Sequence, residues 1–272
     1  MIIDSQYAKL PRPSGGVDHS YGDRVHLLSY PYPMSLLTRL CSEETQQPMV
    51  NHLVSACYDW LLGEVASRLL RTAPVAVPTR MRPINPEGVY HGEAVAERQR
   101  VVVVDIARAG ILPAHRLYQG LHLFVDPRDL RQDHIVASRT TDDKGAVSGV
   151  KIDSSKIGGP ANGATVLIPD PMAATGTSLA AVAKKYLNSP DGPPREIAAI
   201  HLIVTPEYLK RVTQEFPQMH IFAIRLDRGL SHPDVLKARP GDRWDEEVGL
   251  NDTHYIVPGA GGVGEVLNNA WI

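Results

Sequence analysis

The feature that most constrains the fold of this chain is the run VVVV at its centre, within VVVVDIARAG at residues 101–110. Four consecutive β-branched residues favour a strand that is buried on both faces, as strands of parallel sheets are. Apolar stretches that predict three further strands lie at residues 134–138, 166–169 and 197–204. Helical patterns lie at residues 110–120, 179–187 and 207–215. This alternation predicts an α/β protein with a mostly parallel, doubly wound sheet flanked by helices.

Composition excludes several classes of protein. The 272 residues, 43% of them apolar, can bury a sizeable core in one large domain or two small ones. A formal net charge of -2 provides no basic face for phosphate neutralisation, so no nucleic-acid partner is expected. Cys41 and Cys57 are predicted to be two buried free thiols rather than a disulfide or a thiolate metal cluster. The histidines show no paired metal-ligand spacing, so we expect no metal site made by the protein alone.

The amino terminus does not look like a secretory leader, because it places Asp4 and several prolines where an apolar segment would stand. No apolar run approaches the roughly 20 residues that cross a bilayer. We therefore expect a soluble, cytoplasmic protein without a membrane partner.

Composition also suggests how the chain is organised. Residues 1–24 are rich in Pro, Gly and Ser and are expected to form an arm outside the core, whereas residues 25–272 should form a single domain. Apolar residues at helical spacing across residues 35–70 predict two helices broken around residues 46–48. Residues 72–99 are rich in Pro and are predicted to be irregular.

The stretch VLIPDPMAATGTSL, residues 166–179, is the strongest candidate for a binding site. A strand that stops before Asp170 and a helix that starts near Thr177 leave free amides and the hydroxyls of Thr175 and Ser178 around one small concavity. Helix starts bind phosphate readily, but the same hydroxyls could equally cap the helix, so both interpretations stay open here. A carboxylate at the strand end suits the vicinal hydroxyls of a ribose. Together these groups suggest a ribose 5-phosphate.

The segment DPMAATGTS, residues 170–178, resembles the phosphoribosyl diphosphate (PRPP) motif of type I phosphoribosyltransferases, and most closely that of uracil phosphoribosyltransferases. Three more segments match that family in the same order. ARAGI at residues 107–111 resembles its Arg-Ala-Gly loop, SRTTDD at residues 138–143 stands where the family has a mobile Arg-bearing segment, and LN followed by YIVPG at residues 250–259 resembles its base-binding tail. The resemblance implies a type I phosphoribosyltransferase-like fold with a small hood formed by the C-terminal tail.

The resemblance also implies an activity, transfer of the phosphoribosyl group of PRPP to uracil in pyrimidine salvage, giving UMP and diphosphate. Arg108 and Arg139 would hold the diphosphate, because guanidinium groups stay charged and grip phosphate oxygens bidentately, and Asp170 would hold the ribose hydroxyls. These three are the expected catalytic residues. The remaining PRPP-binding residues are expected to be Pro171, Met172, Ala173, Ala174, Thr175, Gly176, Thr177 and Ser178. Mg2+ would arrive with PRPP, since Pro171 leaves few carboxylates for the metal.

By the same resemblance, main-chain groups of the tail would recognise the edge of uracil. The uracil-binding residues are expected to be Ile256, Gly261, Gly262 and Val263. This tail diverges from the family, whose Gly-Leu-Gly-Asp-Ala-Gly-Asp becomes Gly-Ala-Gly-Gly-Val-Gly-Glu at residues 259–265. The first tail acid, expected to contact PRPP, is therefore replaced by Gly262.

The residues before the tail extend the range of possible functions. About nineteen residues, 231–249, look inserted; the simplest expectation is a solvated surface loop, and the alternatives are an oligomer contact or a cover over the site. The open functions are an active uracil phosphoribosyltransferase, a PRPP-binding regulatory or inactive paralogue, and a phosphoribosyltransferase for another base. The resemblance further implies a homodimer or homotetramer and a possible GTP effector.

Overall fold

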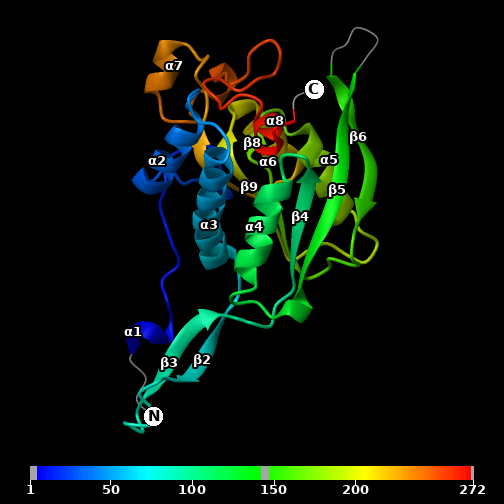
Figure 1. Cartoon of the computed structure of the whole chain (residues 1–272). Helices are drawn as coiled ribbons and strands as arrows, with labels where there is room; N and C mark the ends of the chain where they lie inside the picture. Colours follow the sequence, from blue (N-terminus) through cyan, green and yellow to red (C-terminus); the bar gives the residue numbers. More distant parts are fainter. Residues whose placement is uncertain (1–4, 142–146, 271–272) are drawn as a thin grey trace.

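The centre of the molecule is a twisted sheet whose strand order is β1-β10-β9-β7-β4-β5-β6, with a short β8 beside β9, in a computed structural model that describes residues 5–141 and 147–270 (Figure 1). The strands are β1 (Val25–Leu27), β4 (Val101–Ala107), β5 (Leu130–Thr141), β6 (Val147–Lys156), β7 (Thr165–Pro169), β8 (Met172–Ala173), β9 (Glu196–Val204) and β10 (His220–Leu226). Among these strands, only β5 and β6 pair antiparallel. The prediction of a mostly parallel α/β sheet is confirmed.

Helices cover both faces of the sheet (Figure 1). The helices of one face are α2 (Pro31–Leu40), α3 (Met49–Leu69) and α4 (Ile111–Leu121), and those of the other are α5 (Thr177–Leu187) and α6 (Pro206–Glu215). The valine run shows why both faces must be covered. Val101 and Val103 belong to the core beneath α3 and α4, whereas Val102 and Val104 belong to the core beneath α5 and α6. The two-sided burial predicted from four consecutive β-branched residues is confirmed.

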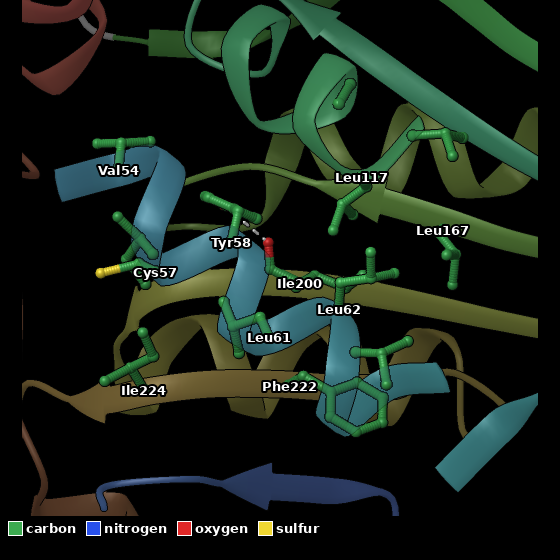
Figure 2. Packing of buried hydrophobic residues seen from close by; sticks show 14 of the residues in the cluster. Val54, Cys57, Tyr58, Leu61, Leu62, Leu117, Leu167, Ile200, Phe222 and Ile224 are labelled. Carbon is green, nitrogen blue, oxygen red and sulfur yellow. Dashed lines mark hydrogen bonds between the residues drawn. The ribbon is translucent and has the colours of Figure 1, made fainter. Parts of the chain in front are cut away.

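Figure 2 shows how α3 packs on β9 and β10. Val54, Leu61 and other apolar side chains of the helix lie over Ile200 and Phe222, and all four of these residues are buried. Full burial of one such side chain contributes about 1.5–3 kcal/mol. Tyr58 is also fully buried, and its hydroxyl donates to the carbonyl of Ile200 at 3.1 Å. This bond satisfies the one polar group that the tyrosine brings into the core.

Both cysteines are free, as predicted. Cys57, on α3, is buried, and burial raises the pKa of its thiol to about 12. Cys41 is only half-buried, which differs from the expectation of two buried thiols. None of the helices in the described residues is long and apolar enough to cross a membrane.

The expectation that residues 72–99 are irregular is wrong. They form an antiparallel hairpin of β2 (Thr72–Pro78) and β3 (Val89–Val95) that projects away from the main sheet (Figure 1). Prolines are tolerated here because an edge strand has an unpaired side on which no N–H is needed. The sequence does not reveal this hairpin, because prolines usually indicate irregular structure.

Residues 1–24 pack on their own domain at several points. A short helix, α1 (Ser5–Ala8), leads to Arg12, whose guanidinium donates to the carbonyls of Ser67 and Leu70 at the end of α3. Tyr21 is only 4% exposed and belongs to the core, whereas most of the other described residues of this segment are exposed.

Residues 231–249 lie largely at the surface, as a solvated segment would, but they are not an irregular loop throughout. The segment contains α7 (Pro233–Lys237) and the 3-10 turn η2 (Trp244–Glu246), which is followed by Glu247, whose side chain is fully buried. This carboxylate pairs with Arg228 at 2.7 Å, accepts the amide of Gly241 at 2.9 Å and accepts the hydroxyl of Tyr21. The segment is therefore an ordered element that anchors the amino-terminal residues to the domain.

Candidate active site

The sheet topology brings the ends of β4, β5 and β7 together. Arg108 directly follows β4 and Asp170 directly follows β7, and these two strands are parallel neighbours. Ala107 pairs with Val136 of β5, so the backbone of Arg139 lies further along β5 on the same side of the sheet. The side chain of Arg139 lies outside the described part of the structure. In open α/β sheets, ligands bind at this edge, outside the carboxyl ends of the strands.

The loop after Asp170 is folded tightly against the neighbouring strand. Met172 and Ala173 form β8, which pairs with β9, and the carbonyl of Pro171 accepts the amides of β9 at 3.0 and 3.1 Å. Gly176 has φ +76° and immediately precedes α5, which starts at Thr177 as predicted. A left-handed conformation of this kind favours glycine.

The hydroxyls of this loop do not cap α5. The residue at the N-cap is Gly176, and no side chain there bonds the amides of the first turn. The hydroxyls of Thr175 and Thr177 instead lie 3.0 Å from each other. Plain capping, the alternative interpretation of these hydroxyls, is therefore not what the structure shows. A helix start with uncapped amides and nearby hydroxyls suits an oxyanion.

The main chain of Asp170 is fixed from beneath by buried groups. Its amide donates to the carbonyl of Ile200 at 3.0 Å, and its carbonyl lies 2.6 Å from Nδ1 of His201. Burial lowers the pKa of His201 to about 4, so its imidazole is neutral at pH 7. Because a carbonyl only accepts, Nδ1 carries the proton, and Nε2 accepts from the hydroxyl of Tyr208 at 2.6 Å. A fully buried histidine thus holds the candidate catalytic acid in place.

Arg108 and Arg211, two of the guanidiniums near this edge, contact different groups. Arg108 pairs with Glu265 at 3.6 Å, whereas the nearby Asp105 bonds His134 at 2.9 Å. Arg211, on α6, donates from Nη1 to Oγ1 of Thr177 at 2.5 Å. Arg211 was not anticipated from the sequence, because α6 follows the PRPP loop by some thirty residues and Arg211 belongs to no motif.

The tail returns to the same edge of the sheet. Leu250 and Ile256 form an isolated antiparallel bridge, and the buried carboxylate of Asp227 accepts the amide of Gly259 at 2.7 Å. Gly262 then precedes α8 (Val263–Asn268), which lies beside the end of β4 (Figure 1). The described tail therefore forms the expected hood next to the Arg108 loop.

The predicted uracil-binding residues are partly committed to contacts within the protein. The side chains of Ile256 and Val263 pack against the core beneath α3. The amide of Val263 donates to the carbonyl of Gly261 at 3.0 Å, and Gly261 has φ +68°. The carbonyl of Gly262 accepts the amides of Glu265 and Val266, both at 3.1 Å.

The turn between β9 and α6 connects the hydroxyl loop with the base of the tail. Oγ1 of Thr205 accepts the amide of Tyr208 at 3.0 Å and donates to the carbonyl of Ala174 at 2.7 Å. Two residues later, Oε1 of Glu207 accepts the amides of Gly249 and Leu250 at 2.9 and 3.2 Å. The Thr-Pro pair at 205–206 is a helix-start signal in the sequence, but the sequence does not reveal its partners.

The donor set at this edge is poor in metal ligands. Over residues 5–141 and 147–270, no three His, Cys, Asp or Glu side chains are grouped closely enough to hold a metal ion. A divalent cation here would need most of its oxygen ligands from a substrate and from water.

A parallel sheet with an arginine, a carboxylate and an uncapped hydroxyl-rich helix start at its carboxyl edge is the arrangement expected of a protein of the phosphoribosyltransferase class. The sequence model of one family within that class, described as uracil phosphoribosyltransferase, matches residues 28–246. The chain belongs to the uracil phosphoribosyltransferase family.

Individual relatives agree with this assignment. A uracil phosphoribosyltransferase of Thermococcus sibiricus is 27% identical over 222 residues, which are 80% of this chain and 87% of the relative. One from a Nocardioides species is 30% identical over 253 residues, 90% of this chain and 97% of the relative. The solved structure of the AQ2163 protein from Aquifex aeolicus superposes with a TM-score of 0.65 at 23% identity and covers 89% of this chain and 97% of its own, which shows the shared fold.

Proposed function

We propose that this chain is an enzyme that transfers the phosphoribosyl group of PRPP to uracil and releases UMP and diphosphate. The observation that carries the proposal is the convergence of the PRPP loop, the Arg108 loop and the tail at one edge of the sheet. Arg108 contacts Glu265 of the tail, and Asp170 follows the strand next to that of Arg108. One site can therefore hold both substrates.

The reaction requires positioning more than covalent chemistry from the protein. A ring nitrogen of uracil forms a bond to C1 of the ribose while the bond from C1 to diphosphate breaks, and the nitrogen loses its proton. Residues 173–178 would hold the 5-phosphate, Asp170 the ribose hydroxyls, and Arg108 and Arg139 the diphosphate, on which negative charge develops. Orientation of the two reactants and stabilisation of the leaving charge are the two contributions expected of such a site.

Mg2+ is proposed to enter with PRPP, on whose diphosphate oxygens it would bring most of its ligands. The chemistry of the donor set supports this, because Pro171 stands next to Asp170 and no three-ligand cluster occurs in the described residues. Bound there, the ion would neutralise part of the diphosphate charge. The roles of Arg108 and Asp170 in gripping phosphate and ribose hydroxyls do not depend on direct metal contact.

A homodimer or homotetramer and a GTP effector, which rest on the family resemblance, and a cytoplasmic location, which rests on the amino-terminal sequence and the lack of a long apolar run, complete the proposal. Sedimentation velocity with and without GTP tests the first two. A change in the sedimenting mass or in the rate of UMP formation when GTP is added would support the effector. Identical sedimentation profiles and reaction rates with and without GTP would remove it.

The enzyme activity is tested by incubating the purified protein with PRPP, Mg2+ and a panel of bases and following nucleotide and diphosphate by chromatography. We expect UMP from uracil, with diphosphate in equal amount. Product only from another base would change the substrate assignment. No product from any base, together with thermal stabilisation by PRPP, would leave the PRPP-binding regulatory function.

A further inference from the structure

Arg211 reaches the start of α5 from a neighbouring helix. Its Nη1 donates to Oγ1 of Thr177 at 2.5 Å, and its Nε lies 3.7 Å from Oε1 of Glu215, one turn further along α6. The same face of α6 closes over the loop, because a Cβ at Gly176 would lie 3.1 Å from Tyr208 and 3.2 Å from Val212. The guanidinium is therefore held at the end of the PRPP loop that is formed by Thr175, Gly176 and Thr177.

This position is electrostatically unfavourable for a cation on its own. The amino end of a helix carries a positive partial charge, so a guanidinium there is repelled unless an anion is also present. Glu215 compensates only in part, because its Oε2 also pairs with Lys184 of α5 at 2.9 Å. One carboxylate thus serves two cations, Arg211 near the start of α5 and Lys184 in the last turn of that helix. An arrangement that costs free energy in the unbound protein is typical of a site that is completed by a ligand.

The hydrogen-bond direction indicates what Arg211 does. A guanidinium only donates, so its bond occupies a lone pair of the Thr177 hydroxyl and leaves the O–H of Thr177 available as a donor, either to the hydroxyl of Thr175 or to a ligand. The neighbouring hydroxyl of Thr175 lies 3.0 Å away from it. Arg211 therefore orients the hydroxyl of Thr177 as a donor and adds positive charge behind it. A phosphate group needs both.

We propose that Arg211 is a positioning residue for the 5-phosphate of the nucleotide, acting through Thr177. The proposal rests on the proposed function and adds to it which arginine acts on which phosphate group. Arg211 serves the 5-phosphate, which PRPP and UMP share, whereas Arg108 serves the diphosphate. Loss of Arg211 should therefore weaken the binding of UMP but not that of diphosphate. Loss of Arg108 should weaken the binding of diphosphate but not that of UMP.

Calorimetric titration of the full chain with UMP, and separately with diphosphate plus Mg2+, tests this division. We expect Arg211→Ala to raise the dissociation constant of UMP about tenfold, the effect of one charge-assisted hydrogen bond, and to change that of diphosphate less than about twofold. Arg211→Lys should recover part of the UMP affinity, because it retains the charge. Lys210→Ala is the matched control, since it removes a cation from the same helix that pairs with Asp245 instead.

A double-mutant cycle tests the route through Thr177. Thr177→Val removes the hydroxyl at nearly constant volume, and if Arg211 acts through it, Arg211→Ala should have little further effect on UMP binding in that background. Full additivity of the two changes would overturn the route. Unchanged UMP affinity in Arg211→Ala would overturn the proposal, and so would equal losses for UMP and diphosphate, which indicate a general structural role. Failure of the parent protein to bind UMP would instead defeat the proposed function, and the role of Arg211 with it.

Discussion

Arg108, at the end of β4, and Glu265, on the tail helix α8, lie 3.6 Å apart and join the two halves of the candidate site. The same tail helix meets the β4 loop a second time, since a Cβ at Gly264 would lie 3.6 Å from that of Ala109. A Cβ at Gly262 would lie 2.5 Å from Oε2 of Glu265. The carboxylate of Glu265 thus occupies the space that a side chain at position 262 would need.

An acid restored at position 262 would be expected to improve the enzyme if it contacted PRPP, but the position of Glu265 predicts the opposite. Gly262→Asp should lower kcat/KM for PRPP, because the new side chain displaces Glu265 and two carboxylates then repel each other. Glu265→Ala should lower it up to about fivefold, the upper end for a half-exposed ion pair. The double variant with Gly262→Asp and Glu265→Ala retains one carboxylate and should recover the loss. Higher activity in the single Gly262→Asp variant would contradict this account.

Asp170→Asn and Arg108→Ala should each weaken PRPP binding by roughly tenfold or more, because each removes a charged partner of the substrate. Asp170→Asn retains the shape of the side chain and the main-chain bonds to Ile200 and His201, so the loop should stay in place. Titration with PRPP and Mg2+ measures the loss. Arg116→Ala is the control, since it removes a guanidinium that pairs with Asp59 on the surface. If both site variants bind PRPP like the parent, the site is misplaced.

Gly176→Ala tests the conformation of the PRPP loop. Its φ of +76° and the contacts that a Cβ would make with Tyr208 and Val212 predict a loss of about 1–2 kcal/mol of stability, together with weaker PRPP binding. Gly63→Ala is a matched glycine replacement within α3, where a Cβ meets no atom within 4 Å. That variant should gain about 0.5–1 kcal/mol, because alanine favours a helix interior. Equal effects of the two replacements on thermal unfolding would argue against strain at Gly176.

The parts of this fold that the sequence predicts well are those with strong local signals. The valine run, the helices on either side of Pro48 and the start of α5 at Thr177 agree with the structure to within a few residues. The strands β1, β6 and β10 were not anticipated. The last of these, HIFAIRL, mixes His and Arg into an apolar pattern, and β6 is largely polar because it lies at the edge of the sheet.

Contacts between distant segments could not be predicted from the sequence. Arg211 and Thr177 are far apart in the chain, and so are Arg108 and Glu265, and neither pair belongs to a motif with fixed spacing. The charged run DRWDEE, residues 242–247, predicts a solvated loop because charge usually indicates exposure. The fold instead buries Glu247 with a guanidinium, an amide and a hydroxyl around it.

Glu247→Ala should therefore destabilise the protein strongly. Removing one partner leaves the largely buried guanidinium of Arg228 without its carboxylate, which typically costs about 3–5 kcal/mol, and it also frees Tyr21 from the segment. Urea unfolding measures the loss. The neighbouring Glu246→Ala removes an exposed carboxylate of the same segment and should change stability by less than about 0.5 kcal/mol. A similar, small effect of both variants would mean that the buried pair contributes little.

The buried His201 makes the stability of the site depend on pH. Its pKa is about 4 in the folded protein against an ordinary value of 6.5, because burial disfavours the charged imidazole. The unfolded chain therefore binds the proton more readily. The stabilisation is complete above about pH 6.5 and is lost as the pH falls from there towards 4. A pKa shift of this size corresponds to about 3 kcal/mol of unfolding free energy between the two ends of this pH range.

The expected result is that His201→Gln flattens the fall in unfolding free energy between pH 6.5 and 4.5, measured by urea titration at several pH values. Tyr208→Phe is the matched comparison, because it removes the hydroxyl bonded to Nε2 but retains the buried imidazole. It should lower stability while leaving the pH slope nearly unchanged. A constant difference between the parent and His201→Gln across this range would show that His201 does not titrate on unfolding as argued. Since Nδ1 of His201 holds the carbonyl of Asp170, the His201→Gln variant should also bind PRPP more weakly at pH 7.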